Sequence, residues 1–218
     1  MEWLYKLQRK HGKFAIPNLM LIIVIGQLFI YFANMLFAER GVISWFAFDR
    51  AAILSGQVWR LITFIFVPNV SGIIWLLLSL YFYYMIGGAL ENEWGCFIFN
   101  VFYFIGVFCT LIAGFITGVA TNQFLNLSLF FAFAILFPDY QIMLFFIIPV
   151  KMKYLAIVDA VIYIYYFIVG GWSLRAAIIA ALANLAVFFG GTLIKKLKQN
   201  AQYRKRRNEF RREMNRWK

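Results

Sequence analysis

The chain has 218 residues, of which 64% are hydrophobic, 21% aromatic and only 14% charged, and its formal net charge is +12. A soluble domain needs about a quarter of its residues charged to cover its surface, so this composition excludes a water-soluble protein and predicts an integral membrane protein. The two cysteines, Cys96 and Cys109, lie in one apolar stretch with no disulfide framework and no metal-ligand spacing, so we expect no metal and no cofactor.

The apolar stretches divide the chain into three parts. A basic segment over 1–15 precedes a membrane domain over 16–194, and a basic tail follows over 195–218. Because a helix of about 20 residues crosses about 30 Å of hydrocarbon, the domain has room for six helices, and we predict an all-α polytopic membrane protein. The predicted spans, bounded by Pro, Gly or charge, are 16–37, 73–90, 97–119, 124–137, 154–169 and 174–194.

Four of the apolar segments carry further expectations. The first span, 16–37, lacks a small-residue cleavage site and is followed by further spans, so we expect a retained helix rather than a signal peptide. The fourth, 124–137, is too short to cross alone and must begin below the surface, shielded by its neighbours, because unpaired backbone cannot face lipid. The still shorter segments 59–67 and 141–148 fit interfacial or re-entrant pieces.

The basic residues favour one orientation in the membrane. With both termini in the cytoplasm, 17 of the 21 Lys and Arg residues lie on the inner side. The positive-inside rule therefore predicts six helices with the N- and C-termini inside. The same rule accounts for the net positive charge, so we expect no nucleic-acid partner. The four basic residues that remain outside are Arg40, Arg50, Arg60 and Arg175.

The tail contains apolar residues at helical spacing among its cations, namely Tyr203, Phe210, Met214 and Trp217. This pattern describes a basic amphipathic helix on the anionic lipid of the inner leaflet, where each cation contributes about 1 kcal/mol. A solvated stop-transfer tail is the main alternative, and a contact with the ribosome or RNA is a weaker one.

Two strings flank the second predicted span. GQVWRLITFIF over 56–66 precedes it, and GGALENEWG over 87–95 closes it. The pattern G-Q-x-W-R-L-x-T-x-x-F, an apolar span and then G-G-A-L-E-x-x-W-G resembles the rhomboid superfamily, which includes the rhomboid intramembrane proteases and the derlins. Downstream, AFAILFP over 132–138 is similar to the end of the rhomboid fourth helix, and Pro149-Val-Lys to the motif that opens the fifth. The match covers residues 50 to 191 and implies a rhomboid-like six-helix bundle in a bacterial plasma membrane.

The resemblance also implies that the catalytic positions are altered. Gln123 stands where active rhomboids carry the serine nucleophile, and Asn184 stands where they carry the histidine base. Ser79 replaces an Asn that helps to bind the oxyanion, and Trp75 replaces a His. The resemblance therefore implies a vacated site, in which neither substitution at 75 or 79 restores what was lost.

The residues limit catalysis independently of any resemblance. The only histidine, His11, lies in the N-terminal basic segment, so a Ser/His dyad inside the membrane domain is impossible. A Ser/Lys hydrolase would need Ser128 together with Lys151 or Lys153, which the predicted topology places in a cytoplasmic loop. Ser128 with Ala132 fits a small-xxx-small packing face better.

Two aspartates raise the alternative of an intramembrane aspartyl dyad, although the required Gly-x-Gly-Asp string is absent. Asp139 follows Pro138, where a turn acid is ordinary. Asp159 lies six residues, about 9 Å, past Lys153 inside the fifth span, where an unpaired charge is costly. We expect Asp159 to be a structural acid that snorkels or pairs with Lys153, or else a polar group on a client pathway.

The remaining motif residues form an expected scaffold. Trp59 and Arg60 suit the membrane interface, where they would reach headgroups or loop carbonyls. We expect Glu91 to accept hydrogen bonds from backbone at the start of the third helix, because the helix dipole favours an anion there. We expect Asn184 to add an interhelical hydrogen bond. Small residues expected to allow close helix approach are Gly87, Gly88, Gly114, Gly118, Ala176 and Ala180.

The sequence as a whole predicts a rhomboid-like pseudoprotease that does not cleave and that binds transmembrane segments of client proteins. By analogy with the derlins, the short fourth span and the segment 59–67 would thin the bilayer locally and admit a client helix from the side. One alternative is an active protease with unorthodox residues. Another is a small-solute transporter, which is disfavoured because the spans contain few polar groups and show no clear inverted repeat.

Overall fold

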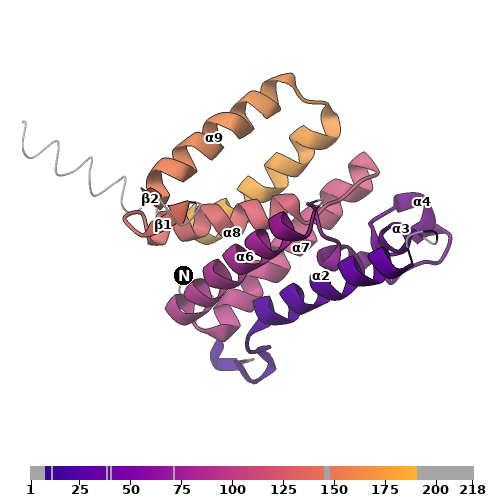
Figure 1. Ribbon diagram of the computed structural model, residues 1–218, viewed down its shortest axis with the longest axis horizontal. Coiled ribbons are helices and arrows are strands. Elements are labelled where there is room, and N and C mark those ends of the chain that lie inside the picture. Colours follow the sequence, from indigo (N-terminus) through magenta and orange to yellow (C-terminus); the bar gives the residue numbers. More distant parts are fainter. Residues whose placement is uncertain are drawn as a thin grey trace, which may run out of the picture.

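The structure is a computed structural model that describes residues 8–10, 12–37, 39, 41–70, 72–144 and 148–190. Those residues form a bundle of helices (Figure 1). Three groups of predictions lie outside the described residues. They concern His11 and Arg40, the end of the sixth span over 191–194, and the whole basic tail over 195–218.

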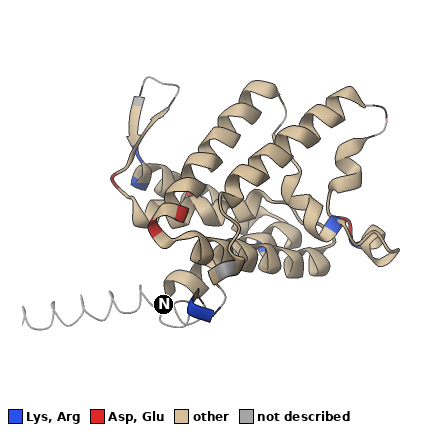
Figure 2. Cartoon of the chain, turned by 90° about the horizontal axis from the view of Figure 1, so that it is seen from below, with Lys and Arg blue, Asp and Glu red and all other residues tan. Residues whose placement is uncertain are grey.

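Five described helices are long and apolar enough to cross a membrane, with mean hydropathy from 1.7 to 2.3. A further apolar helix, α8, has 14 residues. Charged residues are rare along these helices (Figure 2). The chain is therefore a helical multi-pass membrane protein, and the predicted spans are confirmed as helices to within about one turn. The helices are α2 (Leu19–Leu36), α6 (Ile73–Trp94), α7 (Cys96–Thr117), α8 (Gln123–Leu136), α9 (Met152–Val169) and a last helix, Trp172–Gly190.

The segment between α2 and α6 consists of short helical pieces. They are α3 (Val42–Phe46), α4 (Arg50–Leu54), α5 (Arg60–Thr63) and the 3-10 turn η3 (Phe64–Phe66), and another 3-10 turn, η1 (Gly12–Phe14), precedes α2. None of them is long enough to span a bilayer. The prediction that 59–67 does not cross is confirmed, whereas α3 and α4 were not predicted.

The described residues of the segment 141–148, which is predicted to be an interfacial or re-entrant piece, lie in strands, so the chain is not entirely α-helical. Strands β1 (Gln141–Leu144) and β2 (Ile148–Lys151) pair antiparallel, with Gln141 opposite Lys151 and Ile142 opposite Val150. A short apolar run carries no period that separates strand from helix. Its β-branched residues and Pro149, which disfavours a helix interior, favour the strands.

The centre of the bundle is formed by α7 and α8. Nine of the 14 residues of α8 are buried, which confirms that its neighbours shield this short helix. In the 18-residue apolar stretch of α7, 56% of the stretch is buried inside the protein, whereas the buried share of the corresponding stretch of α9 is 6%. Figure 1 shows α2 and α9 at opposite edges, with α6, α7 and α8 between them. The helix α9 therefore packs against the rest of the bundle over only a small part of its surface.

Candidate functional site

A buried asparagine fixes the start of α8. The side chain of Asn122 is 1% exposed, and its Nδ2 donates to the carbonyls of Ile65 at 2.7 Å and Val67 at 2.9 Å. Its Oδ1 accepts a hydrogen bond from Asn69. These bonds satisfy backbone carbonyls in a dry interior, where an unpaired carbonyl is costly. Asn122 therefore holds η3 and the residue after it against the start of α8.

A small polar cavity lies beside this asparagine. It has a volume of about 20 Å³ and lies between α2, α6, α8 and the loop that contains Asn69. Gln27 of α2 lines it and donates to the Ile65 carbonyl at 3.1 Å. A space of this size suits about one water molecule and is too small for a solute. The residues that line it are Gln27, Asn69, Val70, Leu76, Ser79, Tyr83 and Asn126.

From this cavity a band of polar side chains extends to α9. Tyr83 of α6 lies near Asn126 of α8, and the polar groups of the two side chains interact. On α9, Tyr163 interacts in the same way with the side chain of Gln123, the first residue of α8. The carboxylate of Asp159 lies within electrostatic range of both tyrosine hydroxyls. We define the polar band by these five residues, which join the inward face of α9 to α6 and α8.

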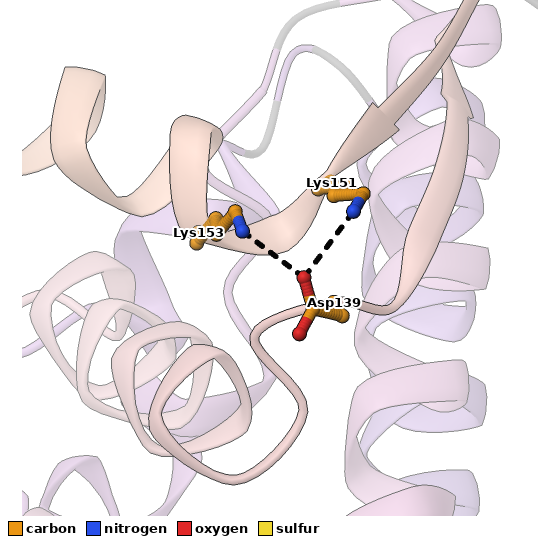
Figure 3. A network of polar contacts seen from close by, with 3 residues as sticks. All are labelled: Asp139, Lys151 and Lys153. Atoms are coloured by element: carbon orange, nitrogen blue, oxygen red, sulfur yellow. Dashed lines mark hydrogen bonds and ion pairs between the residues drawn. The ribbon is translucent and has the colours of Figure 1, made fainter.

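The charge of Asp159 has no cationic partner among the described residues, in which salt bridges join only Asp139 to Lys151 and Lys153. The expected pairing of Asp159 with Lys153 is therefore wrong. The lysine Nζ instead lies 3.0 Å from Asp139 Oδ1, and Lys151 Nζ lies 3.4 Å from the same oxygen (Figure 3). The turn after α8 therefore brings Asp139 beside the two lysines at the start of α9.

The cluster of Asp139, Lys151 and Lys153 joins the end of α8 to the base of the β-hairpin. Hydrogen bonds from Lys153, and then from Lys151, lower the pKa of the Asp139 carboxyl below its ordinary value. All three side chains remain substantially exposed, so water and salt screen the pairs. The cluster orients the hairpin rather than forming a buried catalytic dyad.

The structure does not join the two positions implied as nucleophile and base by any hydrogen bond. Asn184 Nδ2 instead donates to Ser128 Oγ at 3.0 Å, and that hydroxyl donates to the Leu125 carbonyl at 2.7 Å. Both Asn184 and Ser128 are buried, at 0% and 1% exposed. Gln123 is exposed and lies on the polar band. The expected interhelical hydrogen bond of Asn184 is confirmed.

The other two implied positions are also separate. Ser79 Oγ donates to the Leu76 carbonyl within its own helix at 2.8 Å, and the residue lines the small cavity. Trp75 is 56% exposed. No hydrogen bond among the described residues joins any two of the four positions.

Arg60 is buried and binds backbone carbonyls, as one of its two predicted roles requires. Its Nη1 donates to the carbonyls of Ser44 and Ala47, and its Nε donates to Gln57 Oε1 at 2.8 Å. The adjacent Trp59 donates its indole N–H to the Trp45 carbonyl at 3.4 Å and stays 45% exposed. The two residues fold the segment of short helices onto itself.

Glu91 caps a different helix from the one predicted. Its Oε1 accepts from the backbone N–H of Asn18 at 3.0 Å, at the start of α2 and not of the third helix. Asn100 Nδ2 and Cys96 Sγ bind the neighbouring Ile16 carbonyl, both at 3.1 Å. The helix α6 continues to Trp94, so Glu91 lies within its last turn and faces the entry to α2.

Some of the predicted glycines lie tightly against neighbouring side chains, and others have open space where a Cβ atom would be. A Cβ atom at Gly87 would lie 2.5 Å from Met20 Cγ, so this glycine lets α2 approach α6 as predicted. At Gly114 it would lie 2.7 Å from Ala120 Cβ. A Cβ at Gly88 would meet nothing within 4 Å, and Gly118 instead ends α7 with φ +90°. The predicted close approach is therefore wrong for Gly88 and Gly118.

Several residues of the site were not singled out from the sequence. Gln27, Asn69, Tyr83, Asn126 and Tyr163 belong to the cavity or the polar band. A signal for Gln27 and Asn126 was present, because an amide inside an apolar span is costly unless it finds a partner. In the described residues, no group of three or more His, Cys, Asp or Glu is placed to hold a metal ion.

Comparison with known proteins adds no relative. No protein-family model matches the chain, and no curated protein matches it. The rhomboid resemblance therefore rests on the motifs of the sequence itself.

Proposed function

We propose that this chain is a non-cleaving membrane protein with a rhomboid-like helix arrangement and both termini inside, and that it binds transmembrane segments of other membrane proteins beside α9. The observation that carries the proposal is the sparse packing of α9. A helix that spans the bilayer with only 6% of its apolar window buried leaves a lateral face for another helix.

The packing of α9 is confined to one stripe. Met152 is buried, and Leu155, Ala156, Asp159 and Tyr163 are partly buried at three- to four-residue spacing. Every side chain from Ile164 to Val169 is exposed. The second half of α9 thus buries no side chain, although Arg175 donates to the carbonyls of Phe167 and Ile168 at 2.9 Å. Dispersion between closely packed side chains is a main source of helix association in lipid. A client helix would supply those contacts.

The surroundings of Ser128 support the non-cleaving part of the proposal. A serine nucleophile needs a base within hydrogen-bond reach. The hydroxyl of Ser128 is instead held by Asn184, and an amide side chain does not act as a base near neutral pH. Both lysines of the Ser/Lys alternative are engaged by Asp139.

Photocrosslinking in the native membrane tests the client role. A photoreactive residue at Gln123, on the polar band, should trap membrane proteins of defined mass, and so should one at Trp75. The matched control is Phe29, which is 70% exposed on α2 at the opposite edge. Protein adducts at Gln123 that are absent at Phe29 are expected, and adducts with lipid alone at both positions would contradict the proposal.

Cleavage is tested separately with purified protein and single-span test substrates in liposomes. The parent chain and Ser128→Ala should both leave the substrates intact. Fragments that the parent produces and the variant does not would replace the non-cleaving assignment with a protease.

A further inference from the structure

The position of Asp159 is unlike that of any other charge in the spanning helices. It is the only charged residue in the described spans that lies more than one turn from a helix end, since the others, Glu91, Glu93, Lys153 and Arg175, are all near the ends. It lies seven residues beyond Met152, which places it about 10 Å along α9. A charge at this depth is costly unless a partner or water compensates for the lost hydration.

Two uncharged hydroxyl groups lie within electrostatic range of the Asp159 carboxylate. They are the hydroxyls of Tyr83 and Tyr163, with which it interacts electrostatically. No Lys or Arg nitrogen of the described chain lies within ion-pair distance of its carboxylate. The residue is half-buried on the stripe by which α9 meets α6 and α8, and it borders the exposed face of α9. The carboxylate is therefore reachable from the side on which a client would lie.

We propose that Asp159 recognises a basic side chain on the client, so that the preferred partner is a transmembrane helix with one Lys or Arg about two turns from its cytoplasmic end; this inference rests on the proposed function. Charge complementarity selects this partner, because an ion pair at low dielectric compensates two charges that are each costly alone. A second copy of this chain is a poor match, since its described spans offer no cation at that depth.

The test uses the full chain in liposomes and fluorescent single-span helices rich in Leu and Ala. One helix carries Lys two turns from the end at the cytoplasmic leaflet, and its matched control carries Gln there. Energy transfer from a label on the chain measures binding. The Lys helix should bind about tenfold more tightly than the Gln helix, the scale of a desolvated charge pair.

Three variants separate charge recognition from a structural role. Asp159→Asn should bind the Lys helix as weakly as the parent chain binds the Gln helix and leave binding of the Gln helix unchanged, whereas Asp159→Glu should keep the preference for Lys. Asp159→Lys should reverse it and favour a helix with Glu at the same position. Asp139→Asn, in the exposed cluster, should retain the full preference for Lys.

The failures of the two proposals are distinguishable. Equal binding of the Lys and Gln helices by the parent chain would overturn the role of Asp159 and leave the client role standing. Equal weakening of both helices in Asp159→Asn would also overturn it, because that result assigns the residue to packing. Binding of neither helix would contradict the proposed function itself.

Discussion

Single buried side chains stabilise the non-spanning parts of this protein. Arg60 is a clear example, because its buried guanidinium makes three hydrogen bonds. It reaches two backbone carbonyls and the Gln57 side chain while only 8% exposed. Replacing it by Ala leaves those acceptors unpaired, so we expect Arg60→Ala to lower the free energy of unfolding by about 2–4 kcal/mol. Denaturant titration in detergent micelles measures the change.

Arg50 provides the matched control for Arg60. It is exposed, and its Nη1 donates one hydrogen bond to the Phe115 carbonyl at 3.1 Å. Exposed polar contacts contribute little, so Arg50→Ala should cost about 0–1 kcal/mol. Equal effects of the two substitutions would show that the carbonyl contacts of Arg60 do not stabilise the fold.

The contact between Ser128 and Asn184 is predicted to be structural. A double-mutant cycle with Ser128→Ala and Asn184→Ala should give a coupling of about 0.6–1.7 kcal/mol, the range of hydrogen bonds between membrane helices. Unfolding of the four proteins in mixed micelles supplies the cycle. Additive effects would contradict the hydrogen bond at 3.0 Å.

At the scale of elements, the packing of α2 on α6 gives a sharp prediction from two adjacent glycines. Gly87→Ala would place a methyl group 2.6 Å from Met20 Cβ, and such overpacking costs about 1–3 kcal/mol. Gly88→Ala meets open space and gains helix propensity of about 0.5–1 kcal/mol. Thermal unfolding should therefore shift in opposite directions, and a common shift would contradict the packing.

The hairpin is predicted to depend on pH through Asp139. Its folded pKa is lowered, so the lysine pairs stabilise the hairpin above the unfolded pKa of about 3.9 and are lost as pH falls through the folded pKa. Carbon NMR of the Asp139 carboxyl should titrate below 3.9. The midpoint should rise more in Lys153→Gln than in Lys151→Gln, and a midpoint at 3.9 in the parent would contradict the cluster.

Helix locations were predictable because hydropathy and length decide them locally. The predicted span over 154–169 ends at the same residue as α9, and 124–137 matches α8 to one residue at each end. Other features depend on tertiary contacts. The carboxylate of Glu91 binds Asn18, which is 73 residues away in the chain, and no local pattern specifies that partner.

The candidate site was predictable only in part for the same reason. Asp159 was recognisable because a charge inside an apolar span is costly. Its neighbours Tyr83 and Tyr163 are ordinary residues for a membrane helix, and only the packing of α6, α8 and α9 brings them together. The partner of Lys153 likewise depended on the hairpin after α8, which was not predicted.

At the scale of the whole molecule, the short helix α8 leads us to expect a thinner bilayer around the protein. The 14 residues of α8 extend about 21 Å, less than the about 30 Å of hydrocarbon that a spanning helix must cross. We expect lipid near α8 and the short helices to thin locally. Cysteine-scanning with depth-dependent quenchers should report shallower lipid there than beside α2, and equal depths would contradict thinning.

The central claim is that the protein binds transmembrane segments beside α9 and leaves them intact. The most direct measurement combines crosslinking from Gln123 with analysis of the trapped partner by mass, in liposomes that hold the full chain and a labelled single-span protein. The account predicts an adduct that contains the whole partner, with none from the Phe29 control. Fragments of the partner that disappear in Ser128→Ala, or equal adducts from both positions, would contradict it.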